Sequence, residues 1–195
     1  MTYSGDRHYK SCFQILEKMF EVDTEGKSLT GYNRLEFANE LELFCQWFMN
    51  GLLEKPLRPN EQLIFSAMSN QLIIEALAQP TVLVHRDFHS RNLMCLESGE
   101  LGVIDFQDAV VGPFTYDLVS LLKDCYIELP RTEQLAWLTI YLEQLHQAGY
   151  LQCLPKGTVI RWFDLMGLQR HLKVLGIFSR LYLRDDKPTY LVYLP

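Results

Sequence analysis

Long apolar segments are missing from this sequence. No apolar run approaches the roughly 18 residues that a membrane-spanning helix needs. The first ten residues, M-T-Y-S-G-D-R-H-Y-K, lack the apolar core of a signal peptide. These absences argue against a membrane partner and predict a cytoplasmic location.

Excess positive charge is missing too. The 18 lysines and arginines are outnumbered by 24 acidic residues, so the net charge is −6 at pH 7. A general polyanion-binding surface is therefore not expected, and nucleic acid is excluded as an expected partner. Only the segment 156–187 is basic, with seven basic against three acidic residues. We interpret it as a solvated helix face.

Closely spaced cysteine pairs are also absent. The cysteines are odd in number, widely separated and include no C-x-x-C pair, which argues against both a disulfide framework and a zinc site. The sequence therefore predicts reduced cysteines, most of them buried. The five cysteines are Cys12, Cys45, Cys95, Cys125 and Cys153.

Apolar residues, in contrast, are plentiful enough for a globular core. The chain has 195 residues, 48% of them hydrophobic, and contains no internal repeat or low-complexity linker. A chain of this length can bury about two thirds of its unfolded surface. We therefore predict a single domain that spans residues 1–195.

Helical periodicity, with apolar residues three and four positions apart, dominates both ends of the chain. The first such stretch covers residues 9–20 and ends before a loop at Gly26. Asn33 followed by Glu36 has the pattern of a capping box, which predicts the start of a second helix. The apolar residues that this helix should bury are Phe37, Leu41, Phe44 and Phe48. Further helices are predicted over residues 60–79, 117–126, 132–148 and 158–183, with Asp117 and Thr132 as N-cap residues.

Short β-rich pieces replace the helical pattern between Thr81 and Ile104. They read T-V-L-V-H, N-L-M-C-L and L-G-V-I, and E-S-G-E joins the last two as in a tight hairpin. The predicted fold class is therefore mainly α with a small β-hairpin, or α+β. Residues 1–80 and 109–195 form its helical parts, and residues 81–108 form the loop and hairpin between them. The tail T-Y-L-V-Y-L-P stays unassigned.

Two carboxylates and an amide lie at the ends of these predicted strands. Asp87 and Asn92 lie in H-R-D-F-H-S-R-N between the first two strands, and Asp105 follows the third. A hairpin would return the chain to the same end of the sheet, so the three side chains should converge. Asp105 and the amide oxygen of Asn92 are suitable ligands for Mg²⁺, which takes only one or two carboxylates from protein. Asp87 is then free to orient an acceptor hydroxyl, which predicts phosphoryl transfer from a magnesium nucleotide.

These residues resemble a known family. H-R-D-F-H-S-R-N is similar to the catalytic loop H-R-D-x-x-x-x-N of the protein-kinase-like fold, and I-D-F-Q stands in place of its metal-binding D-F-G. With V-I-D-F-Q-D-A-V-V-G-P-F-T-Y-D-L-V-S-L-L, the run resembles the aminoglycoside phosphotransferase and choline kinase family. Together with L-Q-R-H-L-K-V-L-G-I-F, it looks most like the bacterial kinases that phosphorylate the anomeric position of N-acetylmuramate and N-acetylglucosamine. Gln107 replaces the glycine of protein kinases, which argues against a protein kinase.

The resemblance implies a role for each matching residue. Asp87 is the catalytic base, and Asn92 and Asp105 are the magnesium ligands. His85 has a structural role in the loop, and Asp117 supports the loop and starts a helix. The implied co-substrate is ATP with Mg²⁺, and the implied function is phosphorylation of an amino sugar in cell-wall recycling.

The resemblance covers only the C-terminal lobe of the family. An N-terminal β lobe with a phosphate-covering loop and a strand lysine is not found, because the lysines before His85 all lie in predicted helices or loops. These lysines are Lys10, Lys18, Lys27 and Lys55. We therefore expect a lobe of a longer enzyme, inactive without the N-terminal lobe of the same polypeptide. Its exposed apolar cleft could also self-associate.

The acceptor is less well defined by the sequence. Residues that could contact a substrate are Arg86, His89, Arg91, Asp108, Arg170 and His171. Arg170 would favour a sugar with a carboxylate, whereas a polycationic aminoglycoside would favour an acidic cleft. Aminoglycoside, choline or homoserine as acceptor, or a kinase-derived binding domain without catalysis, remain alternatives. The intact set of Asp87, Asn92 and Asp105 favours catalysis, since binding alone does not require all three.

Overall fold

The computed structural model describes residues 4–24 and 29–194, with side chains from residue 7 onward. The chain divides into two compact units. The first comprises Met1–Gly31 and Pro80–Phe163, and the second comprises Tyr32–Gln79 and Asp164–Pro195. The loop predicted at Gly26, with Lys27, lies outside the described residues.

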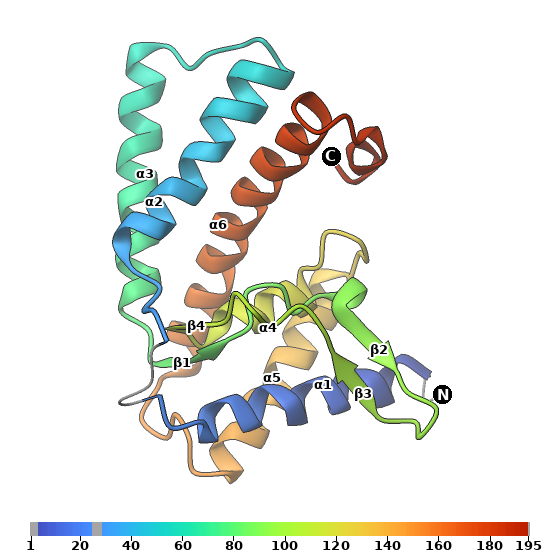
Figure 1. Ribbon diagram of the computed structural model, residues 1–195. Helices are drawn as coiled ribbons and strands as arrows, with labels where there is room; N and C mark the ends of the chain where they lie inside the picture. The colour runs from blue at the N-terminus through green and yellow to red at the C-terminus, as the bar shows by residue number, and fades with distance from the viewer. Residues whose placement is uncertain (1–3, 25–28, 195) are drawn as a thin grey trace. The chain divides into compact units, whose positions relative to one another are not determined.

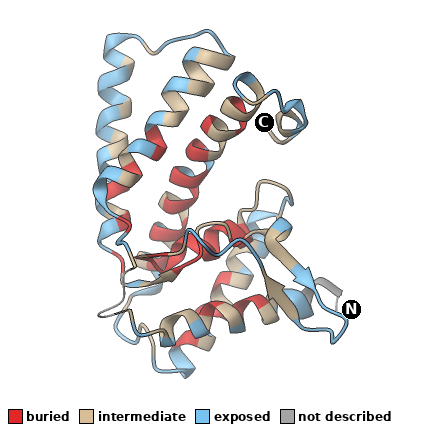
Figure 2. Cartoon of the chain, in the orientation of Figure 1, coloured by how far each residue is buried: buried red, intermediate tan, exposed pale blue. Residues whose placement is uncertain are grey.

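One helix of the first unit, α4 (Thr115–Leu122), is buried at every position (Figure 2). The other helices are α1 (Ser4–Glu21), α5 (Arg131–Gln147) and the start of α6 (Lys156–Leu183) (Figure 1). The apolar face predicted for α1 is confirmed, with Cys12, Phe13 and Leu16 buried. The Phe13 ring contacts Tyr141 of α5 at a centroid distance of 5.0 Å.

Two small antiparallel sheets complete the first unit. β1 (Thr81–Val84) pairs with β4 (Val110–Pro113), and β2 (Leu93–Cys95) pairs with β3 (Leu101–Val103) (Figure 1). The predicted hairpin is therefore confirmed, and the structure is mainly helical with small sheets. The prediction of helix alone after residue 104 is wrong, because it missed β4. This strand is recognisable only through its partner β1, because the paired residues are at least 26 positions apart in the register that joins Val84 to Val110 and Thr81 to Pro113.

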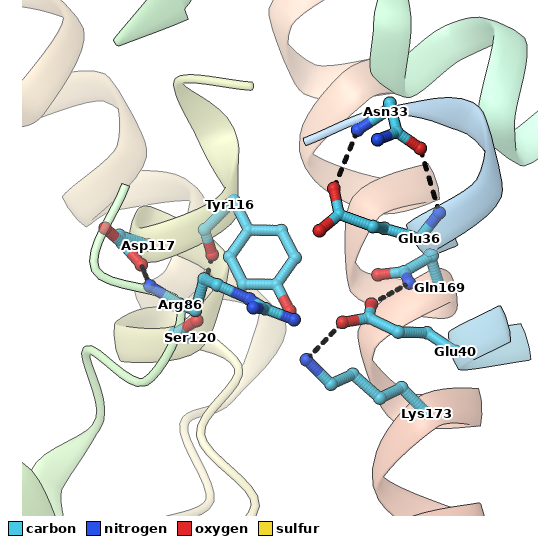
Figure 3. Close-up of polar contacts among 9 residues, drawn as sticks. All are labelled: Asn33, Glu36, Glu40, Arg86, Tyr116, Asp117, Ser120, Gln169 and Lys173. Carbon is cyan, nitrogen blue, oxygen red and sulfur yellow. Dashed lines mark hydrogen bonds and ion pairs between the residues drawn. The ribbon is translucent and has the colours of Figure 1, made fainter. Parts of the chain in front are cut away.

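The second unit consists of helices. They are α2 (Arg34–Leu43), the π-helix η1 (Phe44–Leu52), α3 (Pro59–Leu77), the end of α6 and the 3₁₀ helix η3 (Pro188–Tyr193). The predicted capping box is confirmed: Asn33 Oδ1 accepts a hydrogen bond from the amide of Glu36, and Glu36 Oε2 accepts one from the amide of Asn33 (Figure 3). Asn33 Oδ1 also accepts a hydrogen bond from the amide of Leu35.

The helix that begins after Asn33 changes its hydrogen-bond pattern at Phe44. Phe37 and Leu41 are buried as predicted, but Phe44 and Phe48 are only half-buried. Their rings instead stack on each other at 5.4 Å, and Phe44 also stacks on Phe65 of α3 at 5.5 Å. The π-helical backbone re-aims these side chains away from the direction that an α-helical period predicts.

α2 and α6 meet at a buried ion pair in the second unit. Lys173 Nζ lies 2.7 Å from Glu40 Oε1, and Gln169 Nε2 donates a 2.9 Å hydrogen bond to Glu40 Oε2 (Figure 3). Burial alone would raise the pKa of Glu40, but the charge of Lys173 and hydrogen bonds from Lys173, Tyr32 and Gln169 together lower it. The pair is thus held in its charged form.

The contact between α2 and α6, called the α2–α6 seam, also includes a close approach of their backbones one turn further along α6. A Cβ atom at Gly176 would lie 2.4 Å from the carbonyl carbon of Leu43, closer than any side-chain atom can approach. α6 therefore needs glycine here, because its backbone touches the end of α2 directly.

Several predicted boundaries and burial states are wrong. α4 begins at Thr115 and ends at Leu122, so Asp117 lies in its first turn and is not its N-cap. α5 follows Pro130, so Thr132 is not an N-cap either. Of the five cysteines only Cys12 is buried, and burial raises the pKa of its thiol to about 12. Across residues 4–24 and 29–194, no helix is both long and apolar enough to cross a membrane.

Candidate active site

The segment from His85 to Asn92 connects β1 to β2. Its last three residues form the short 3₁₀ helix η2 (Ser90–Asn92). Because β1 is paired with β4 and β2 with β3, the loop is fixed at both ends. Side chains on a loop held in this way have well-defined positions, as a catalytic group requires.

Asp117 anchors the start of this loop from the first turn of α4. Its Oδ2 accepts a 2.6 Å hydrogen bond from the amide of His85. Its Oδ1 accepts a 3.0 Å hydrogen bond from the amide of Arg86 (Figure 3). The carboxylate is buried, at 3% exposure. Arg86 has a φ of 75°, which is uncommon for a residue other than glycine. The carboxylate thus holds a strained backbone in place.

The ring of His85 connects the loop to Ile104, the residue just after β3. Its Nδ1 accepts a 3.3 Å hydrogen bond from the amide of Asp87, so its Nε2 carries the proton and donates to the carbonyl of Ile104 at 3.0 Å. Burial is the largest influence on its pKa and lowers it, although the Ile104 carbonyl and the charges of Asp87 and Asp105 act in the opposite direction. The imidazole is therefore neutral at pH 7, and both carboxylates are near enough to act on it.

We expect the free energy of unfolding to fall as the pH decreases below about 6.5. The unfolded His85 takes up a proton at about this pH, whereas the folded ring, with its lowered pKa, does not. The unfolded state then binds more protons, and stability declines by up to about 1.4 kcal/mol per pH unit. Urea unfolding at pH 7.5, 6.5 and 5.5 measures this slope. His85→Gln should flatten it relative to His171→Gln, a change at an exposed histidine; equal slopes in both variants would contradict the assignment.

Asn92 links the loop to the residue before Asp105. Its Nδ2 donates a 3.0 Å hydrogen bond to the carbonyl of Asp87, and its own backbone carbonyl accepts a 3.1 Å hydrogen bond from the amide of Ile104. Asp87 and Asn92 therefore belong to one hydrogen-bonded cluster with His85, and this cluster binds Ile104, the residue directly before Asp105. Their roles in catalysis and metal binding stay predictions.

The donor atoms at this cluster fit a magnesium ion that is shared with phosphates. The side-chain nitrogen of Asn92 donates to the carbonyl of Asp87, so the side-chain oxygen of Asn92 is the atom that could bind a cation. Asp105 is exposed, has a φ of 70°, and its Oδ1 accepts a 2.7 Å hydrogen bond from Gln107. Within the described ranges there is no group of three or more His, Cys, Asp or Glu that could hold a metal by itself. One carboxylate with one amide oxygen is the small protein contribution that Mg²⁺ takes when phosphates and water complete its shell.

Sequence reasoning missed the residues that hold the second half of the loop. Asp124, just beyond α4, accepts hydrogen bonds from the amides of Ser90 at 2.9 Å and Tyr126 at 2.8 Å. The Tyr126 ring lies 3.8 Å from the guanidinium carbon of Arg91 and 5.3 Å from the ring of His89, edge to face. Arg91 and His89 thus both rest on Tyr126. The position of Asp124 just after the end of a helix could have indicated this role. It was missed because the helix was predicted to continue to residue 126.

The other candidate residues are more dispersed. Arg86 is half-buried, and Asp108 is exposed in the turn before β4. Arg170 and His171 lie on α6 in the second unit, where Arg170 is buried and His171 is exposed. Contact of any of these with a substrate stays a prediction. Gln107, which was noted only as a departure from glycine, instead positions the Asp105 carboxylate.

The clamped loop, with an exposed carboxylate beside an amide, is the arrangement expected of a phosphotransferase. The model of the phosphotransferase enzyme family matches residues 4–155, and the chain belongs to this family. This confirms the resemblance found in the sequence.

Relatives of this chain are named N-acetylmuramate/N-acetylglucosamine kinase. That of Neisseria meningitidis serogroup B is 44% identical over 180 residues, which cover 92% of this chain and 53% of the relative. That of Pseudomonas putida is 42% identical over 167 residues, 86% of this chain and 49% of the relative. That of Pseudomonas aeruginosa is 38% identical over 192 residues, 98% of this chain and 56% of the relative. The chain thus spans about half the length of the curated relatives it matches.

Proposed function

We propose that this chain carries the catalytic base and the metal ligands of an ATP-dependent amino-sugar kinase. The reaction would transfer the γ-phosphoryl group of ATP to a hydroxyl of N-acetylmuramate or N-acetylglucosamine, in the recycling of cell-wall sugars. The observation that carries this proposal is the cluster in which Asn92 binds the Asp87 carbonyl while its own carbonyl binds Ile104, next to Asp105. The names of the relatives support the choice of acceptor.

Each residue of the cluster would have a separate task. The Asp87 carboxylate would orient the acceptor hydroxyl and take its proton late in the transfer, as a loose transition state requires. Asn92 and Asp105 would hold Mg²⁺, which when bound neutralises charge on the phosphates. Asp117 and His85 would keep Asp87 in position through the amides of the loop.

The groups that cover the nucleotide would come from another part of the complete protein. Four exposed apolar residues lie within four positions of the proposed metal ligands in the sequence, and together they are called the apolar face: Met94, Leu96, Ile104 and Phe106. We propose that the nucleotide and an N-terminal lobe of the same polypeptide cover this face. Residues 1–195 alone are therefore expected to show no ATP turnover in a coupled ADP assay. Turnover by this chain that is lost in Asp87→Asn would contradict this part of the proposal.

The acceptor is tested by measuring ADP release from the complete protein with ATP, Mg²⁺ and a panel of hydroxyl compounds. We expect the highest kcat/KM for N-acetylmuramate and N-acetylglucosamine. Arg170→Ala should raise the KM for N-acetylmuramate by about tenfold more than that for N-acetylglucosamine, if Arg170 pairs with the lactyl carboxylate. Higher kcat/KM for choline, homoserine or an aminoglycoside would overturn the acceptor, and no transfer to any compound would favour a kinase-derived binding domain.

A further inference from the structure

A cavity of about 370 Å³ lies within the first unit, and Ser90 of the loop between β1 and β2 is among its lining residues. α1 contributes Tyr9 and Cys12 to its walls, the hairpin contributes Leu93 and Leu101, and the end of α4 with the following segment contributes Leu121 and Asp124. Its volume is within the range of pockets that bind small organic molecules. None of the catalytic or metal-binding candidates lines it, so it is a separate site.

The walls of this cavity are apolar with a single negative charge. Among the described lining residues, Asp124 is the one acidic residue and there is no lysine or arginine. The Tyr9 ring stacks on Trp137 at 5.1 Å, which fixes its position. Burial, and after it the charge of Asp124, raises the pKa of the Tyr9 hydroxyl. Tyr9 and Asp124 both line the cavity. At the rim, Cys95 Sγ lies 3.7 Å from His8 Nε2.

We propose that this cavity binds a small aromatic amine. The apolar ring would lie between α1 and the hairpin, and the ammonium group would pair with Asp124. The two oxygens of Asp124 each accept one backbone hydrogen bond, so each keeps a lone pair for a further donor. A cation fits better than a neutral or anionic ligand, since Asp124 is the one carboxylate among the described lining residues and no lysine or arginine is among them.

A ligand in this cavity would alter hydrogen bonds that hold the catalytic loop. Ser90 lines the cavity and donates its amide hydrogen to Asp124, and Tyr126, which supports Arg91 and His89, is bound to the same carboxylate. An ammonium group at Asp124 would therefore change the strength of both hydrogen bonds. Binding does not depend on the proposed kinase function; only its consequence for phosphoryl transfer does.

The test is a titration of the ¹⁵N-labelled 195-residue chain, followed by amide chemical shifts, with three indoles of nearly the same size. Tryptamine is cationic, tryptophol is neutral and indole-3-propionate is anionic. We expect tryptamine to bind about fivefold more tightly than tryptophol, the gain of one partly exposed ion pair of about 1 kcal/mol, and indole-3-propionate to bind most weakly. The Ser90 and Tyr126 amides should shift with the same Kd. Equal affinity for all three probes, or shifts that do not include Ser90, would overturn the proposal.

Variants distinguish the cavity from other surfaces. Asp124→Asn should remove the preference for tryptamine over tryptophol while keeping ring binding. Cys95→Trp, a change at an exposed position on the rim, should block all three probes, and Cys153→Trp, at another exposed cysteine outside the cavity, should leave binding unchanged. Unchanged tryptamine binding in Cys95→Trp would contradict the site even if Asp124→Asn fails to fold.

Discussion

Replacement of Asp87 by asparagine in the complete protein is expected to lower kcat for N-acetylglucosamine by about 10²–10⁴-fold, with little change in the KM for ATP. This range of about 10²–10⁴-fold is the rate acceleration that one general base typically contributes. Asparagine keeps the shape of the side chain but cannot accept a proton. The hydrogen bonds of residue 87 with His85 and Asn92 both use its backbone, so these two hydrogen bonds should survive the change.

Steady-state kinetics of the complete protein measure this effect, with saturating ATP and a varied sugar concentration. Glu97→Gln is a matched control, because it removes an exposed carboxylate from the turn between β2 and β3 in the same unit. It should leave kcat unchanged. If Asp87→Asn retains more than about a tenth of kcat, the residue orients or binds but is not the base.

Replacement of Asp117 by alanine is expected to lower the free energy of unfolding by about 2–5 kcal/mol. The change leaves the amides of His85 and Arg86 buried without their acceptor, and each unsatisfied buried group costs about 1–3 kcal/mol. The free energy of unfolding of Asp117→Asn should lie between those of Asp117→Ala and the wild type. The amide oxygen of asparagine can accept from one of the two backbone donors, but its NH₂ group cannot accept from the other.

Urea unfolding of the 195-residue chain measures this loss, with Glu97→Ala as the control for removal of a carboxylate. A second measurement separates stability from positioning. In the complete protein at a temperature where Asp117→Asn stays folded, kcat should fall more than the KM for the sugar rises, because Asp87 loses its orientation. A loss below about 1 kcal/mol in Asp117→Ala would indicate that water or another group satisfies the two amides.

The features that sequence analysis predicted correctly depend on neighbours along the chain. The Asn33 capping box, the apolar face of α1 and the β2–β3 hairpin each depend on residues less than about twelve positions apart, and local propensity and periodicity describe them well. The family resemblance rests likewise on contiguous motifs.

The features that it missed depend on distant partners. Asp117 resembles an N-cap, but its carboxylate binds the amide of His85 32 positions earlier, and Asp124 binds the amide of Ser90 34 positions earlier. β4 becomes a strand only by pairing with β1, and the change to a π-helix at Phe44 goes with stacking on Phe65 of α3. A single sequence has no signal for such pairs, because either partner alone has an ordinary local explanation.

The α2–α6 seam has a consequence for how the second unit opens. Glu40 and Leu43 lie one turn apart on α2, and their partners Lys173 and Gly176 lie one turn apart on α6. The ion pair and the close backbone contact, at successive turns, fix the register of the two helices. A shift of one helix along the other would leave a buried charge without its partner and would press a side chain against backbone. Fraying of one helix without the other is therefore disfavoured, and the pair behaves as one cooperative block.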